Sequence, residues 1–173
     1  MFKGDKIYLR QLKNEDATTL VLWENDVTNW HLSDTEAPFS LVEIKNYISN
    51  ASNIRENRQV RFMICLVDSD KPIGAIDLFN ISFKHKRAGV GILIADKENY
   101  GKGYASEAIL LCLKYGQEIL EIDNYFCSIQ SDNLESIGLF QKLLFEQVGI
   151  RKNWYIFNGE KFDELLFQRL MNK

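Results

Sequence analysis

A glycine-rich loop in the middle of the chain carries the clearest chemical signal in the sequence. The run Tyr100-Gly101-Lys102-Gly103-Tyr104-Ala105 follows an apolar stretch and precedes a long amphipathic one. The first turn of a helix presents unpaired N–H groups and a partial positive charge, and glycines let that backbone approach an anion closely. The loop therefore predicts a phosphate site, with a plain strand-to-helix turn as the alternative interpretation.

Two common nucleotide-binding motifs do not describe this loop. The dinucleotide fingerprint requires a third glycine, and Ser106 stands at that position. A P-loop requires Gly-Lys-[Ser/Thr] after four intervening residues, and that sequence is absent.

Carboxylates form the second group of candidate residues. Asp77, the polar residue of an otherwise apolar strand, is the best candidate for a general base, and a solvent-facing strand end is the alternative. The segment 24–39 brings carboxylates close to aromatic side chains. An acidic and aromatic lining suits a cationic amine, although an ordinary solvated loop has the same composition. The substrate-binding candidates are Trp30, Asp34, Glu36 and Asp77.

Hydrophobic periodicity predicts the elements that position these residues. Strands are expected at 7–10, 60–67, 73–79, 88–95 and 125–129, and helices at 14–24, 40–51, 104–120 and 132–144. Ser40 and Glu43 form a capping-box sequence, and Asp132 with Glu135 is expected to start the last helix. Asn158-Gly159 is a strong turn signal for a final hairpin. This order of elements predicts an α/β domain around a mixed sheet.

Composition narrows the classes of function. The 173 residues are 46% hydrophobic and include only two prolines, so we expect one domain without a linker. A formal net charge of −3 does not provide the basic surface that captures nucleic-acid phosphates. No run approaches the ~20 apolar residues that span a bilayer, and the three cysteines lack metal-ligand spacing. A cytoplasmic protein without nucleic-acid, membrane or metal partners is expected.

Several modest motifs in a shared order make the chain resemble the GNAT-superfamily N-acetyltransferases. It is most similar to the branch that contains ribosomal-protein N-terminal acetylases and bacterial spermidine acetyltransferases. The motifs are Ile7-Tyr8-Leu9-Arg10-x-Leu12 with Glu15-Asp16, Ile73-Gly74, Arg87-Ala88, the glycine loop with Glu107, Asn133-x-x-Ser136, Lys142-Leu143-Leu144-Phe145-Glu146 and the Asn158-Gly159 hairpin. The resemblance implies one domain over residues 1–173 with a central mixed, mostly antiparallel sheet of about seven strands and about four helices.

The resemblance also implies acetyl-CoA as cosubstrate, without a metal. In the family the loop binds the pyrophosphate of CoA, and the edge of the preceding strand pairs with the pantetheine arm. The corresponding residues are Leu93, Ile94, Ala95, Tyr100, Gly101, Lys102, Gly103, Tyr104, Ala105, Ser106 and Asn133. The implied reaction is direct attack of a primary amine on the thioester, with a strand N–H stabilising the oxyanion.

Two positions depart from the family pattern. The tyrosine that commonly protonates the leaving thiolate maps to Phe140, so Ser136, one helical turn earlier, or water is the expected substitute. Spermidine acetyltransferases carry a glutamate where this chain has Gly89. The acceptor therefore stays open between a polyamine-like molecule and a protein N-terminal amine. A non-catalytic acyl-CoA-binding or sensory module is the alternative function, and a homodimer is a further expectation from the family.

Overall fold

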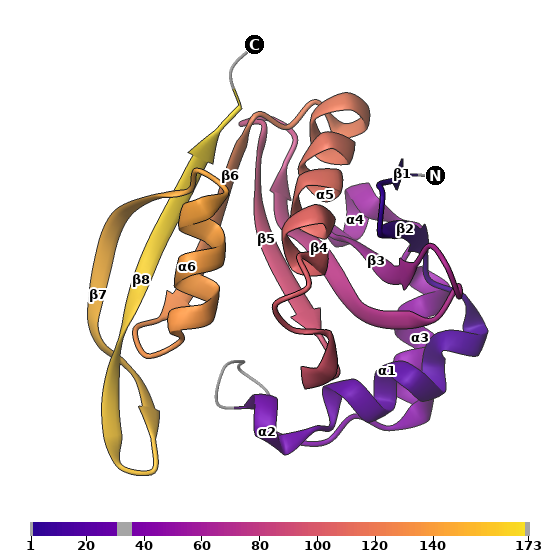
Figure 1. Ribbon diagram of the computed structural model, residues 1–173, viewed down its shortest axis with the longest axis horizontal. Coiled ribbons are helices and arrows are strands. Elements are labelled where there is room, and N and C mark those ends of the chain that lie inside the picture. Colours follow the sequence, from indigo (N-terminus) through magenta and orange to yellow (C-terminus); the bar gives the residue numbers. More distant parts are fainter. Residues whose placement is uncertain (1, 31–35, 172–173) are drawn as a thin grey trace.

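The computed structural model describes residues 2–30 and 36–171 of the chain (Figure 1). Its centre is an eight-stranded sheet in the order β1-β2-β3-β4-β5-β6-β8-β7. The strands are β1 (Phe2–Lys3), β2 (Ile7–Gln11), β3 (Val60–Leu66), β4 (Pro72–Ser82), β5 (Arg87–Ile94), β6 (Asn124–Gln130), β7 (Glu146–Phe157) and β8 (Glu160–Leu170). Neighbouring strands pair antiparallel except β5 and β6, which are parallel. The expected mixed, mostly antiparallel sheet is confirmed.

Six α-helices connect the strands in the described part of the chain. They are α1 (Ala17–Glu24), α2 (Val27–Trp30), α3 (Leu41–Asn50), α4 (Ile54–Asn57), α5 (Tyr104–Leu120) and α6 (Leu134–Lys142). Within residues 2–30 and 36–171, no helix combines the length and apolar character needed to cross a membrane.

Helices cover both faces of the sheet because β3 and β4 carry apolar side chains on both sides. Phe62 and Ile64 of β3 belong to a core cluster with α5 and α6, which lie together over one face (Figure 1). Met63 and Cys65 point the other way and pack under α1 and α3. This period-two alternation explains why β3 reads as a continuous apolar run.

Side-chain caps mark where α3 and α6 begin. The predicted capping box is confirmed: Ser40 Oγ accepts the Glu43 N–H at 3.2 Å, and Glu43 Oε2 accepts the Ser40 N–H at 2.7 Å. The predicted start of the last helix at Asp132 is wrong. Asn133 caps α6 through Oδ1, which accepts the Ser136 N–H at 3.1 Å, because Ser131 and Asp132 form the turn after β6.

The closing hairpin has the predicted turn. Asn158 and Gly159 have φ values of 50° and 82°, the two positive angles that a type I′ turn requires. The hairpin extends the sheet beyond β6 (Figure 1).

The parallel pair β5–β6 separates along its length. Pairing covers only Arg87 with Asn124, Ala88 with Tyr125 and Gly89 with Phe126. Beyond these residues β5 follows β4 and β6 follows β8. Figure 1 shows the two strands adjacent at one end and apart at the other.

A buried contact between α5 and β6 sets the position of the helix that begins at the glycine loop. Tyr125 is fully buried, and its hydroxyl donates to the Leu113 carbonyl of α5 at 2.9 Å. A Cβ atom added at Gly116 would lie 2.3 Å from that hydroxyl oxygen. The helix can therefore pack at this depth only because residue 116 has no side chain.

We expect Gly116→Ala to lower the free energy of unfolding by about 1–3 kcal/mol, because the new methyl group must displace the Tyr125 hydroxyl. Gly138→Ala is the matched control: it lies inside α6, where an added Cβ meets nothing within 4 Å, and alanine's helix propensity should raise stability by up to ~1 kcal/mol. Urea denaturation of both variants measures the difference. Unchanged stability of Gly116→Ala would show that the contact does not fix α5.

Candidate active site

A cavity of about 760 Å³ lies where β5 and β6 separate. Residues 90–94 of β5 form one wall and residues 127–130 of β6 form the other. The glycine loop, α6, the region of α1 and α2, and residues of β3, β4 and β7 also contribute to the lining. The predicted site residues that line the cavity are Trp30, Asp77, Leu93, Ile94, Tyr100, Gly101, Gly103, Tyr104, Ala105, Ser106, Asn133 and Ser136. Segments far apart in the sequence thus meet at one place.

Some predicted site residues lie elsewhere. The lining does not include Ala95 or Lys102. Glu36 is exposed and is also outside the lining. Asp34 lies outside the described residues. Of the expected acceptor residues in the 24–39 segment, Trp30 is at the cavity, where its Nε1 donates to the Glu24 carbonyl at 2.9 Å.

The glycine loop adopts backbone angles that favour glycine. Gly101 and Gly103 have φ values of 71° and 85°, in the left-handed region where a β-carbon is unfavourable. Gly103 is the N-cap of α5 and contributes no side-chain cap. The first N–H groups of this 17-residue helix are therefore available to an anion in the cavity.

Lys6 and Glu107 hold the loop against the N-terminal strands. The Glu107 carboxylate accepts the backbone N–H of Lys6 at 3.1 Å, and Lys6 Nζ donates to the Lys102 carbonyl at 2.9 Å. Sequence reasoning missed Lys6, because it lies 96 residues before its partner and no local pattern marks it. Gly4 allows the approach, since an added Cβ would lie 1.8 Å from Glu107 Oε1.

The backbone of β5 presents its polar groups alternately to β4 and to the cavity. The Ala95 N–H donates to the Ile73 carbonyl at 2.9 Å, on the β4 side. Because successive residues of a strand direct their backbone N–H and C=O groups to opposite sides, those of Ile92 and Ile94 face the cavity. The Tyr100 hydroxyl, which donates to the Ile94 carbonyl at 3.3 Å, fits that direction. Ile92, which was not predicted, is thus better placed than Ala95 to bind an extended ligand.

An arginine joins two carboxylates on the α1 side of the cavity. Arg61 and Asp77 are register partners on β3 and β4. Arg61 Nε lies 2.5 Å from Asp77 Oδ1, and Nη2 lies 2.9 Å from Oδ2. The remaining Nη1 lies 2.6 Å from Glu24 Oε1. The only hint of Arg61 in the sequence is a charged residue inside an apolar strand.

A second arginine–carboxylate cluster lies on β7 and β8. Glu164 is buried, and its two oxygens accept from Arg151 Nη1 at 2.5 Å and from the Tyr155 hydroxyl at 2.9 Å. Tyr155 also lines the cavity. Gln130, at the end of β6, is the register partner of Glu164.

The α6 wall carries Ser136 and Phe140. Phe140 is buried and packs edge-on against Phe145, with ring centroids 5.0 Å apart. Phe140 stands where the family commonly has the tyrosine that protonates the leaving thiolate. A phenylalanine ring has no proton to donate, so Phe140 contributes packing alone. Ser136 is the hydroxyl of this helix that lines the cavity.

Cys127 brings a thiol to the same cavity. Burial raises the pKa of Cys127 to about 12. The thiol is therefore protonated at neutral pH and is a poor nucleophile.

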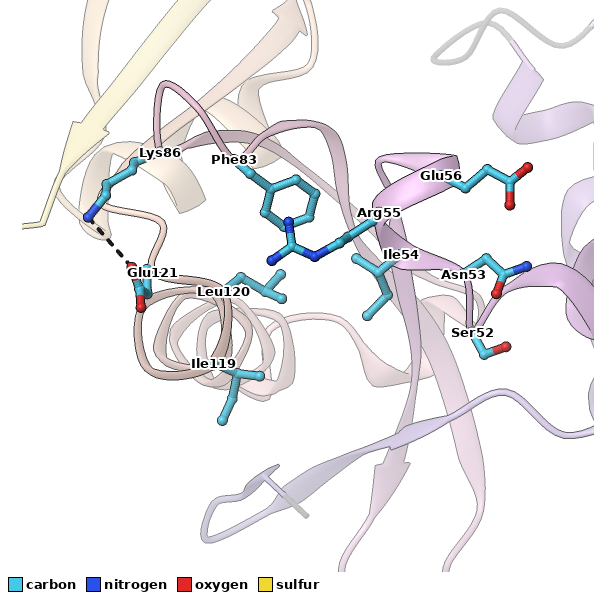
Figure 2. A pocket seen from close by; sticks show the side chains of 10 residues that line it. All are labelled: Ser52, Asn53, Ile54, Arg55, Glu56, Phe83, Lys86, Ile119, Leu120 and Glu121. Atoms are coloured by element: carbon cyan, nitrogen blue, oxygen red, sulfur yellow. Dashed lines mark ion pairs between the residues drawn. The ribbon is translucent and has the colours of Figure 1, made fainter.

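A second cavity of about 700 Å³ lies between α4, the β4–β5 turn and the end of α5 (Figure 2). Arg55 stacks over the Phe83 ring, with 4.5 Å to its centroid, and Lys86 pairs with Glu121 at 3.7 Å. Figure 2 shows Arg55 beside the Phe83 ring and the Lys86–Glu121 ion pair among the side chains that line this cavity. None of its ten lining residues was predicted to bind a ligand, and none lines the first cavity.

Known proteins share both the sequence pattern and the architecture. The spermidine N(1)-acetyltransferase of Escherichia coli (strain K12) is 26% identical over 161 residues, which cover 92% of this chain and 83% of that protein. The structure of spermidine N-acetyltransferase from Vibrio cholerae in complex with CoA and spermine superposes with a TM-score of 0.86 at 23% identity, covering 97% of each chain. The RimL ribosomal L7/L12 α-N-protein acetyltransferase in complex with CoA gives a TM-score of 0.84 at 16% identity, covering 97% of this chain and 96% of that one.

At such identities the two structures establish a common fold. Membership of a family rests on the sequence itself, since residues 6–146 match the acetyltransferase (GNAT) domain family. That match includes the glycine loop, both diverging strands and α6. The chain therefore belongs to the GNAT family of N-acetyltransferases.

Proposed function

We propose that this enzyme binds acetyl-CoA between β5 and β6 and transfers the acetyl group directly to a primary amine. One observation carries the proposal: the strands separate beside an uncapped, glycine-flanked helix N-terminus, so a single cavity offers backbone groups and an anion site together. The CoA complexes among the structural neighbours support it.

The cavity suits the two chemically different parts of the cosubstrate. The N–H groups at the start of α5 would bind the pyrophosphate, with the Lys6 ammonium close by at the Lys102 carbonyl. The cavity-facing groups of Ile92 and Ile94 would pair with the pantetheine amides as an added strand does. Asn133 retains its amide N–H groups for the same ligand, since its Oδ1 caps α6.

Direct transfer requires a neutral amine. A lysine-like amine has a pKa near 10.4, so its deprotonation at pH 7 costs on the order of 4–5 kcal/mol. The protonated Cys127 thiol does not favour a covalent acetyl-enzyme route. The nearby carboxylates are therefore the groups that would receive the proton of the amine.

The two carboxylates paired with Arg61 are not equally able to accept that proton. Both oxygens of Asp77 accept from Arg61, so Asp77 can take a proton only if it gives up that pairing. Glu24 pairs through Oε1 alone, and Oε2 has no hydrogen-bond partner among the residues described. We propose that Oε2 of Glu24 binds the ammonium group of the acceptor and accepts its proton. Asp77 holds Arg61 in place beside Glu24.

Acetyl-CoA turnover with a panel of amines tests the proposal. We expect thiol release that depends on an amine, at a rate that rises with pH as the amine deprotonates. The rise should level off near pH 8 for a peptide α-amine, and continue past pH 9 for a lysine-like primary amine. Binding of CoA without acetylation of any amine would instead support the non-catalytic module.

The glycine loop provides a direct test of the CoA site. Gly103→Glu forces a side chain onto a residue with φ of 85° and places a carboxylate where phosphates are proposed to bind. We expect calorimetry to show at least a tenfold loss of CoA affinity, about 1.4 kcal/mol. Gly159→Glu is the control, because Gly159 has a similar φ of 82° but lies in the distal hairpin. Equal CoA affinity in both variants would contradict the assignment.

Ser136 is the proposed proton donor to the CoA thiolate. Ser136→Ala should lower kcat by about 10²-fold if general-acid catalysis operates there, with little change in CoA affinity. Phe140→Tyr in the same background should restore part of the rate, because it returns an acidic hydroxyl to the same helix. Full activity of Ser136→Ala would show that Ser136 is not the acid and that water protonates the CoA thiolate.

A further inference from the structure

Gln130 is a buried polar side chain on which two polar atoms lack a partner among the described residues. It ends β6, is 5% exposed and lines the active-site cavity. Neither its Nε2 nor its Oε1 has a hydrogen-bond partner within the described residues. The buried carboxylates Asp16 and Glu164, in contrast, are both paired with arginines. An unpaired buried amide costs free energy, so such groups are normally satisfied by a partner.

The unpaired buried atoms gather at one place. Within residues 2–30 and 36–171 they are Asn99 Nδ2 and the two polar atoms of Gln130. Both residues line the cavity between β5 and β6. Asn99 directly precedes the glycine loop on the proposed cofactor side, whereas Gln130 lies across the cavity on β6.

Strand alternation places Gln130 on the acceptor side of the sheet. Tyr125, Cys127 and Ile129 of β6 point into the core beneath α5, so Gln130 points to the opposite face. Asp77 also points to that face, because its neighbours Ile76 and Leu78 belong to the same core. The amide therefore shares a face with the carboxylate cluster that we assign to the amine.

The charges on this face do not suit a polyamine. On this face the cavity lining contains two carboxylates, Glu24 and Asp77, and one cationic side chain, Arg61. Glu135 and Lys142 also line the cavity but lie on α6, over the other face. Arg61 already occupies both oxygens of Asp77 and one oxygen of Glu24. The surplus of one carboxylate matches a single ammonium group and does not match a chain of several.

The hydrogen-bonding capacity of the Gln130 amide also favours a peptide over a polyamine. A glutamine amide donates through Nε2 and accepts through Oε1. An ammonium group only donates, so it would satisfy Oε1 and leave Nε2 unpaired. In an extended peptide the backbone N–H and C=O of one residue point to the same side, so together they satisfy both atoms of Gln130.

We propose that Gln130 determines acceptor specificity by pairing its side-chain amide with the backbone N–H and C=O of one residue of an extended acceptor, which makes the N-terminal amine of a peptide or protein the acetylated group. This inference rests on the proposed function. Gln130 acts on selectivity, and the amine itself is held by Glu24.

The test compares acetylation of short peptides with free N-termini and of spermidine by wild type, Gln130→Leu and Gln130→Glu. Wild type should favour the peptides in kcat/KM. Gln130→Leu should lower kcat/KM for peptides by about ten- to a hundredfold, mainly through KM, and leave CoA affinity unchanged. Gln130→Glu should shift selectivity toward spermidine by about tenfold or more, because it adds an anion and removes a donor.

Gln168→Leu is the matched control. Gln168 lies on β8 and donates to Asn124 Oδ1 at 3.0 Å, outside the cavity lining, so its loss should leave selectivity unchanged. A wild-type preference for spermidine, equal losses for both acceptors in Gln130→Leu, or weakened CoA binding in that variant would each overturn the assignment. Absence of thiol release with every amine would instead reject the proposed function itself.

Discussion

The parallel pairing of β5 and β6 ends after three residue pairs, and the polar backbone beyond it has one neighbour instead of two. Each strand stays fixed by its outer partner, because β5 pairs with β4 up to Ile94 and β6 pairs with β8 up to Gln130. The gap therefore cannot close without breaking one of those ladders. This edge of β5 is half-buried, and an extended ligand with amide groups can pair with its free N–H and C=O groups.

The sheet then separates two kinds of chemistry. The glycine loop and the start of α5 provide N–H groups for an anion, and Glu107 and Lys6 hold that loop in place. The opposite side carries carboxylates whose charge is largely balanced by Arg61 and Arg151. An acceptor entering there meets a nearly neutral wall with few unpaired groups, so hydrogen-bond complementarity decides selectivity more than net charge does.

Local patterns were sufficient to predict most of the fold. Short apolar, β-rich runs identified β3 to β6, the Ser40 capping box identified α3, and Asn158-Gly159 identified the final hairpin, because each signal lies within a few residues. Within the site, the glycine loop and Asp77 were predictable for the same reason. The sequence did not predict individual roles for Arg61, Glu24 and Gln130. Arg61 and Glu24 act through ion pairs with residues 16 to 37 positions away. Gln130 stands out because its amide has no partner among the described residues. Ile92 was not among the predicted residues and Ala95 was, since only the register with β4 reveals which N–H faces the cavity.

Amide hydrogen exchange on β5 tests the central claim that the separated strand edge binds the cosubstrate. The amides of Ile92 and Ile94 face the cavity, whereas the Ala95 amide already donates to Ile73 at 2.9 Å. Saturation with CoA should slow exchange at Ile92 and Ile94 and leave Ala95 unchanged. Unaltered exchange at Ile92 and Ile94 in the presence of saturating CoA would contradict the account.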